Sequence, residues 1–134
     1  MRRGLEEVPF ITETEAKRIK DHAERDIVLL AIRAGYHVSH GPSVRCYPPV
    51  PGKNGEPKIV TGTDYLFTDP DNGMENIVEV TTGNGHSPSK LAQRRVVDQA
   101  GIENYHLLGI SERTTLQRVL SPRDLLLLFR EILK

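Results

Sequence analysis

Residues 64–82 have the sequence DYLFTDPDNGMENIVEVTT. Two β-prone stretches, Asp64 to Phe67 and Asn76 to Thr82, flank the segment Asp69-Pro70-Asp71-Asn72-Gly73, and Pro, Asp and Asn-Gly are typical of tight turns. The pattern predicts an antiparallel hairpin. Because Asp64 opens the first strand and Glu79 lies near the end of the second, the hairpin would bring both carboxylates to one end of a sheet.

The segments on either side of this hairpin predict a mixed α/β domain. Apolar residues at helical spacing indicate helices, and short β-prone runs indicate further strands. The expected helices cover residues 13–34, 90–100 and 125–133, and the expected strands cover residues 36–40 and 105–110. This order predicts an αβββαβ core in which helices flank a mixed central sheet, followed by a C-terminal helix within residues 121–134.

Length and composition exclude several classes of protein. A chain of 134 residues fits one domain spanning residues 1–134. Its Pro- and Gly-rich stretch, residues 41–62, cannot form a central strand and is expected to be a loop or a hairpin. The single cysteine, Cys46, excludes an internal disulfide and Cys-rich zinc sites. No apolar run approaches the ~20 residues of a membrane span, so we expect a folded cytoplasmic protein with no membrane partner.

The two carboxylates of the hairpin suggest a metal site. Asp64 and Glu79 at one sheet edge offer oxygen ligands of the kind that Mg²⁺ or Mn²⁺ prefers, and the backbone carbonyl of Val80 could add a third. Glu79 also lies in an otherwise apolar strand, where burial of an acid without a partner is costly. The alternative is that Glu79 points to solvent from an edge strand while Asp64 caps a turn.

A third acidic residue and the predicted order of helices and strands add a resemblance to a known family. Glu24 in the first expected helix, Asp64, Glu79 and the helix that begins at Lys90 resemble the PD-(D/E)xK nuclease superfamily, whose core is also αβββαβ. Within that superfamily the chain is most similar to small archaeal-type Holliday-junction resolvases. The resemblance implies that Asp64 and Glu79 bind the metal and that Glu24 reaches the site. Alternatively, Glu24 is a solvated helix acid paired with Lys17, Lys20 or Arg25.

The sequence departs from the superfamily at one catalytic position. Where the motif has Glu-x-Lys, this chain has Glu79-Val80-Thr81, and threonine supplies no cation. Some members take the lysine from the following helix, so Lys90 is the expected substitute. Gln93 follows one turn later on the same helix face and could orient a water or a phosphate oxygen. The alternative for Lys90 is an exposed lysine in a first helical turn.

Contact with nucleic acid would depend on local basic groups. Lys+Arg and Asp+Glu are 18 each, giving a formal net charge of +0, so no global field attracts a polyanion. The candidate contact residues are Arg45, Lys53, Lys58, His86, Arg94 and Arg95. A solvated surface of mixed charge is the alternative for the same residues.

The expected function is a Mg²⁺- or Mn²⁺-dependent endonuclease that hydrolyses DNA phosphodiester bonds, structure-selective in the manner of a Holliday-junction resolvase and acting as a symmetric homodimer. Two alternatives stay open. One is a catalytically idle relative that binds nucleic acid or a partner through the same fold. The other is a subunit of a larger recombination, transposition or restriction complex that docks through its Leu-rich C-terminal helix. The pattern is compatible with DNA or RNA, branched or linear.

Overall fold

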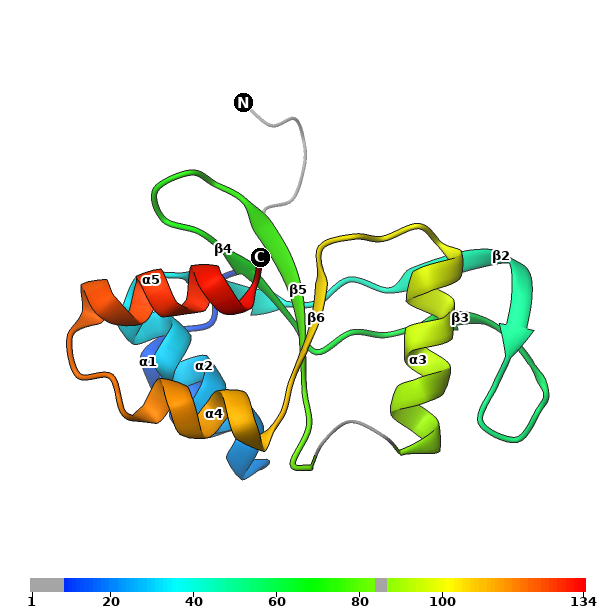
Figure 1. The fold of residues 1–134 in the computed structure, drawn as a ribbon, viewed down its shortest axis with the longest axis horizontal. Helices are drawn as coiled ribbons and strands as arrows, with labels where there is room; N and C mark the ends of the chain where they lie inside the picture. Colours follow the sequence, from blue (N-terminus) through cyan, green and yellow to red (C-terminus); the bar gives the residue numbers. More distant parts are fainter. Residues whose placement is uncertain (1–8, 84–86) are drawn as a thin grey trace.

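The architecture is taken from a computed structural model that describes residues 9–83 and 87–134 (Figure 1). In chain order the elements are α1 (Glu13–Lys17), α2 (His22–Ala34), β1 (His37–His40), β2 (Val44–Pro51), β3 (Pro57–Thr61), β4 (Tyr65–Thr68), β5 (Glu75–Val80), α3 (Pro88–Gln99), β6 (Tyr105–Leu108), α4 (Ile110–Gln117) and α5 (Pro122–Ile132). The chain therefore has the predicted α/β organisation, with one helix more than expected after β6.

The central sheet has the strand order β1-β4-β5-β6. Strand β4 is antiparallel to both β1 and β5, whereas β6 is parallel to β5 and is reached through α3. The predicted hairpin is confirmed: Tyr65 pairs with Val78, which leaves Asp64 and Glu79 at the same end. The turn at the other end is held by the Asp69 carboxylate, which accepts bonds from the N–H groups of Asp71 and Asn72.

A separate hydrophobic core covers each face of this sheet. Val78 and Val80 belong to the core shared with α2, α4 and α5, whereas Ile77 packs with Val96 and Val97 of α3. Figure 1 shows α1, α2, α4 and α5 on one side of β5 and β6, and α3 with β2 and β3 on the other. Because successive strand residues point to opposite faces, Glu79 lies on the α3 face with Ile77.

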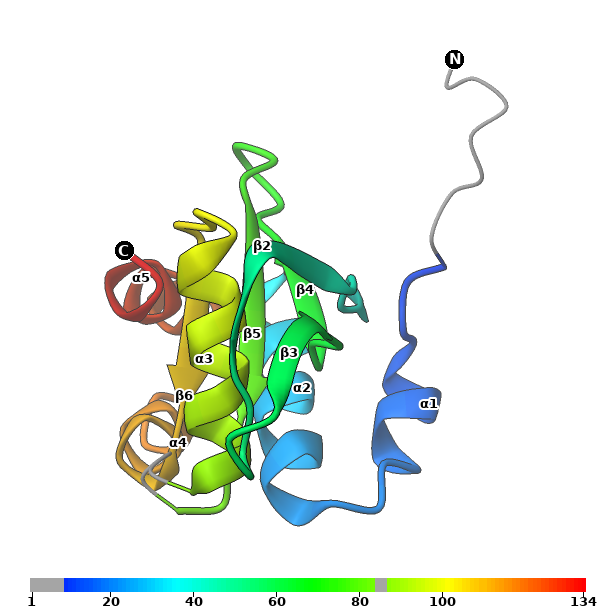
Figure 2. The same cartoon turned by 90° about the vertical axis from the view of Figure 1, so that its right-hand side faces the viewer.

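The prediction of one long first helix is wrong. The chain forms α1 and α2, separated by residues 18–21, and Figure 2 shows the two as distinct helices. The Asp21 carboxylate accepts a 2.9 Å bond from the N–H of Glu24 and so begins a new helix. Because the chain bends there, both Ala16 and Ala23 are buried in the same core.

The predicted strand over residues 105–110 ends early, because the chain turns into α4 directly after Leu108. The N-cap of α4 is Gly109, whose N–H donates to the Glu112 carboxylate at 2.7 Å.

In the C-terminal helix, Leu125, Leu126 and Phe129 are buried in the core, and Leu127 is 46% exposed. The Leu-rich run therefore packs mainly within its own domain. In the part of the chain that the structure describes, no helix is both long and apolar enough to cross a membrane.

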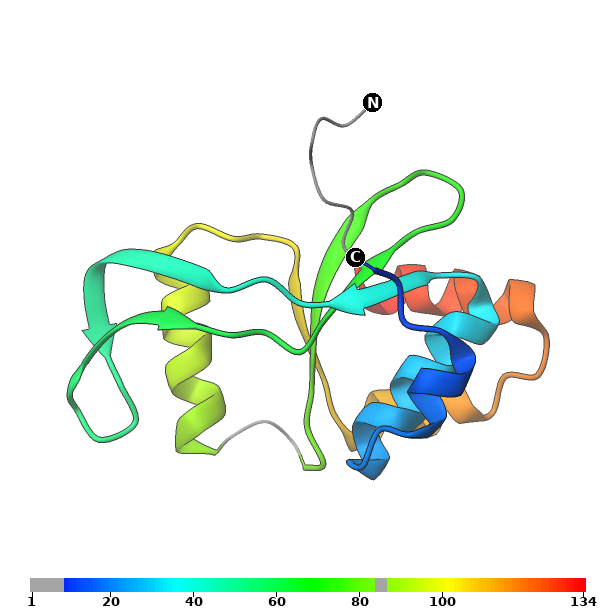
Figure 3. The same cartoon turned by 180° about the vertical axis from the view of Figure 1, so that it is seen from behind.

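Residues 41–62 adopt the hairpin alternative, as β2 and β3. Strand β1 leads into β2 and β3 leads into β4, so the four strands form one antiparallel ribbon that leaves the central sheet at a bend (Figure 3). We call the β2–β3 half of this ribbon the arm. Val44 and Cys46 of the arm pack against α3. At the bend, the N–H of Gly41 donates to the carbonyl of Asp64 at 3.1 Å, and the Thr63 hydroxyl donates to the carbonyl of Pro42.

We expect Gly41→Ala to destabilise the protein by about 1–3 kcal/mol. A Cβ at Gly41 would lie 2.2 Å from the Thr63 hydroxyl oxygen and 2.9 Å from the Thr63 backbone, so the bend would have to shift. The matched control is Gly62→Ala, since a Cβ there meets no atom within 4 Å. Urea unfolding of the two variants measures the difference, and equal midpoints would contradict the tight approach at the bend.

Candidate active site

The bend brings Asp64 and Glu79 into direct contact. The N–H of Asp64 donates to Glu79 Oε1 at 2.8 Å, and the N–H of Val80 donates to Asp64 Oδ2 at 2.9 Å. Each carboxylate thus accepts a backbone N–H from the opposite strand where a regular ladder would pair N–H with C=O. The two acids that the sequence places at one end of the hairpin are fixed side by side.

Lys90 approaches this pair from α3. Its Nζ lies 2.8 Å from Glu79 Oε2 and 3.8 Å from Asp64 Oδ2. The helix begins at this point because the Ser87 hydroxyl accepts the N–H of Lys90 at 3.2 Å and Pro88 occupies the first turn. The structure therefore places the candidate replacement for the missing lysine against both carboxylates.

The charge of Glu79 is strongly influenced by its burial. The side chain is 1% exposed, and desolvation raises the pKa of Glu79 to about 7. The ammonium of Lys90 lowers this pKa, while the charge of Asp64 raises it further. A buried carboxylate beside a second one needs a cation to stay ionised near neutral pH.

Glu24 contacts this cluster indirectly, through Tyr65. The hydroxyl of Tyr65 donates to Glu24 Oε1 at 2.7 Å from the α2 side of the sheet. Burial raises the pKa of Glu24, the bond from Tyr65 lowers it, and the nearby charge of Asp64 raises it. Among the described residues, no hydrogen bond or ion pair joins Glu24 to Asp64, Glu79 or Lys90.

Tyr65 is a site residue that the sequence analysis missed. Burial, followed by the bond to Glu24, raises its pKa, so the hydroxyl stays protonated and donates. Two signals could have indicated it. Tyr65 follows Asp64 in a strand and must face the opposite side, toward the predicted first helix. A buried tyrosine hydroxyl also requires a partner.

Gln93 lies one turn beyond Lys90 on α3. Its Oε1 is buried and has no hydrogen-bond partner among the described residues. An unpaired buried amide oxygen is costly unless a water or a ligand donates to it. Gln93 is therefore available to a bound water or ligand. The hydroxyl of Thr81, the position at which the predicted motif would have lysine, accepts a 3.4 Å bond from the N–H of Gly83.

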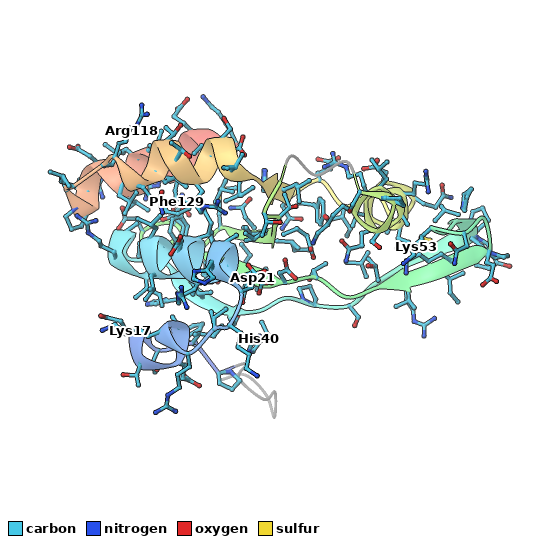
Figure 4. All side chains as sticks on the ribbon, turned by 90° about the horizontal axis from the view of Figure 1, so that it is seen from below. Lys17, Asp21, His40, Lys53, Arg118 and Phe129 are labelled. Atoms are coloured by element: carbon cyan, nitrogen blue, oxygen red, sulfur yellow. The ribbon has the colours of Figure 1, made fainter. Side chains whose placement is uncertain are left out.

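The described candidate nucleic-acid contacts lie on two elements, α3 and the arm. Arg94 pairs with Asp98 at 3.1 Å and lies over the Tyr105 ring, and Arg95 donates to the carbonyl of Pro51, linking α3 to the arm. The remaining described candidates lie on the arm: Arg45 and Lys53 are exposed and Lys58 is half-buried. Figure 4 shows Lys53 on the arm, far from Asp21 at the start of α2. His86 lies outside the described residues.

The donor set fits a hard divalent cation. No group of three or more His, Cys, Asp or Glu side chains suited to a metal occurs within residues 9–83 and 87–134. Mg²⁺, however, commonly binds through one or two carboxylates and keeps several waters. Asp64 and Glu79 would hold the ion. The carbonyl of Val80 faces the same side as its N–H, toward Asp64, and could add a ligand.

Comparison with protein-family models, curated proteins and solved structures finds no match to this chain. The functional argument therefore depends on the geometry of the site and on the motif residues themselves.

We expect the free energy of unfolding to fall between pH 5 and 8 in metal-free buffer because of Glu79. Its pKa is raised from 4.5 to about 7, so the folded protein retains a proton that the unfolded chain has lost. The stabilisation from this group is complete below about pH 4.5 and is lost as the pH rises through about 7. Urea unfolding should show wild type losing stability relative to Glu79→Gln across this range. Glu131→Gln, on the exposed side of α5, should follow wild type, and a constant difference between Glu79→Gln and wild type would contradict the raised pKa.

We expect Tyr65→Phe to raise the pKa of Glu24. The bond from the Tyr65 hydroxyl stabilises the ionised carboxylate, so its removal favours protonation. Carbon-detected NMR titration of the glutamate side chains measures the shift. Tyr47→Phe, an 87% exposed position on the arm, is the control and should leave Glu24 unchanged. An unshifted Glu24 in Tyr65→Phe would show that the hydrogen bond is absent in solution.

Proposed function

We propose that this protein is a divalent-metal-dependent endonuclease that hydrolyses DNA phosphodiester bonds. The observation that carries the proposal is the buried Glu79 carboxylate, which lies beside Asp64 and within 2.8 Å of the Lys90 ammonium. Two fixed carboxylates and a cation at the ends of two neighbouring strands can supply metal ligands and positive charge, which metal-assisted phosphodiester hydrolysis uses.

Each residue has a distinct role in this proposal. Asp64 and Glu79 hold Mg²⁺ or Mn²⁺, which when bound lowers the pKa of a water ligand and offsets phosphate charge. Lys90 donates to the phosphate oxygens on which negative charge develops. Gln93 offers its free Oε1 to the attacking water. Glu24, fixed by Tyr65, contributes negative charge at the edge of the site.

The element order supports a relationship with the PD-(D/E)xK nucleases. The αβββαβ order is matched by α2, the antiparallel strands β1, β4 and β5, the crossover helix α3 and the parallel strand β6, with the arm inserted between β1 and β4. In this interpretation Lys90 replaces the motif lysine that Thr81 lacks. The Glu-bearing helix α2 favours a structure-selective, junction-resolving enzyme, and a cytoplasmic location is part of the same proposal.

Binding of DNA is assigned to the arm and the outer face of α3. Arg45, Lys53 and Lys58 of the arm, with Arg94 and Arg95, provide positive charge for phosphate contacts. His86 belongs to the same proposal through its place in the sequence before α3. A symmetric homodimer would present two such sites to two strands.

Two observations favour a second candidate function. The Lys90 ammonium already forms an ion pair with the carboxylates, and the Thr81 hydroxyl accepts the N–H of Gly83 in the turn after β5. A catalytically idle relative, serving as a binding subunit in a recombination, transposition or restriction complex, would retain this arrangement. It would bind DNA or a protein partner without cutting DNA.

The proposed nuclease is tested by cleavage of a labelled four-way DNA junction and a matched linear duplex with Mg²⁺ or Mn²⁺. We expect Asp64→Asn, Glu79→Gln and Lys90→Met each to lose about 10²-fold or more in rate, because each removes a group that stabilises the transition state. Lys134→Met is the control, since Lys134 pairs with Glu131 on α5 and should keep the wild-type rate.

The pattern of losses separates the candidate functions. Cleavage that persists in Asp64→Asn would come from a contaminant or from another site and would contradict the proposal. Binding of the junction by wild type without cleavage under either metal would favour the idle binding subunit. A junction-to-duplex rate ratio near one would remove the structure-selective part of the proposal alone.

A further inference from the structure

The Lys90 ammonium is the counter-ion of the carboxylate pair in this structure. It lies 2.8 Å from Glu79 Oε2 and 3.8 Å from Asp64 Oδ2. Within residues 9–83 and 87–134, no other Lys, Arg or His forms an ion pair with either acid. The second oxygen of Glu79 and one oxygen of Asp64 accept backbone N–H groups from the facing strand. The pair is thus held in place, and one of its two charges is offset, without a metal ion.

Helix stability does not account for a lysine at this position. Lys90 lies in the first turn of α3, where the helix dipole disfavours a positive charge, and that turn contains no acidic residue. Ser87 already caps the helix through the N–H of Lys90. The ammonium is therefore stabilised by the two carboxylates and not by its own helix.

The lysine side chain is also partly open to solvent. It is 21% exposed, against 25% for Asp64 and 1% for Glu79, so Lys90 and Asp64 reach solvent whereas Glu79 does not. A flexible four-carbon stem carries the charge, and no rigid bidentate geometry holds it. Because Glu79 Oε1 already accepts the N–H of Asp64, an ion that binds Oε2 would take the place that the ammonium occupies.

We propose that Lys90 is a displaceable counter-ion, which competes with a divalent cation for Asp64 and Glu79. Two cations at the same carboxylates repel each other, so loading of the ion moves the ammonium outward. There it becomes available to a phosphate oxygen. The metal requirement is set by this competition, and the site is weakly loaded until substrate offers the lysine a new partner. The inference rests on the metal site of the proposed function and does not require cleavage.

Metal affinity of the full chain tests the competition directly. We expect Mn²⁺, measured by electron paramagnetic resonance at mildly alkaline pH without DNA, to bind Lys90→Met about tenfold more tightly than wild type. Methionine preserves an unbranched stem and removes the charge. Lys90→Arg keeps the charge and should bind as weakly as wild type. Lys134→Met, on α5, is the control for a loss of charge elsewhere and should not change the affinity.

A measurement on wild type covers the case in which Lys90→Met does not fold. Lysine ammonium groups held in ion pairs can be observed by ¹⁵N NMR, so the Lys90 signal should be present without metal and should shift or disappear on titration with Mg²⁺. The Lys134 signal should not change over the same titration.

Equal or weaker Mn²⁺ binding by Lys90→Met, or a Lys90 signal unaffected by saturating Mg²⁺, would overturn the competition. These results are separate from the cleavage assay. Tighter binding by Lys90→Met with no cleavage by wild type supports the counter-ion and removes the nuclease. Metal-dependent cleavage by wild type with equal affinities keeps the nuclease and removes the counter-ion.

Discussion

The burial of one carboxylate is the constraint on which this structure depends. Glu79 lies near the end of the inner strand β5 and is buried on the α3 face, where an acid without partners would destabilise the fold. Its two oxygens are satisfied from different parts of the chain: Asp64 donates a backbone N–H from the ribbon, and Lys90 donates from α3. Satisfying Glu79 therefore requires the ribbon bend, the β5 strand and the crossover helix to meet at one place.

This requirement explains why the α3 side of the molecule differs from the side covered by α2, α4 and α5. The latter core is built mainly from helices packed on the sheet, and it includes the large aromatic residues Tyr36, Phe67 and Phe129. The α3 core is smaller, and the arm supplies part of its apolar surface. The Glu79 carboxylate and its Lys90 partner lie on the face whose core the arm helps to cover.

The sequence predicted best those features that a short segment of the chain determines. The Pro-Asp-Asn-Gly turn fixes the register of β4 against β5, and the register alone places Asp64 beside Glu79. The break between α1 and α2 was not predictable from periodicity, because the apolar positions continue across Asp21 as if one helix continued. Helix α4 was missed because its N-cap, Gly109, offers no side-chain cap and follows a strand without a turn signal.

The contacts of the site could be predicted from the sequence to different extents. Spacing placed Lys90 within reach of the carboxylates, since the helix after β5 must return along the sheet. The bond between Tyr65 and Glu24 joins residues on opposite sides of a long connection, and no local pattern specifies it. The arm was predictable only as one of two alternatives, because its prolines exclude a central strand and permit an outlying one.

The ribbon bend lies between the candidate site and the arm. Asp64 belongs to the strand that stays in the sheet, whereas Lys90 belongs to the helix on which the arm rests. Strand pairs β1–β4 and β2–β3 are two lengths of one continuous ribbon, joined at the bend where the N–H of Gly41 donates to the carbonyl of Asp64. Asp64 therefore lies at the junction between the sheet and the arm, while the arm packs on the helix that carries Lys90. The same arm is thus attached to both partners of the ion pair, to Asp64 through the backbone and to the helix of Lys90 through packing.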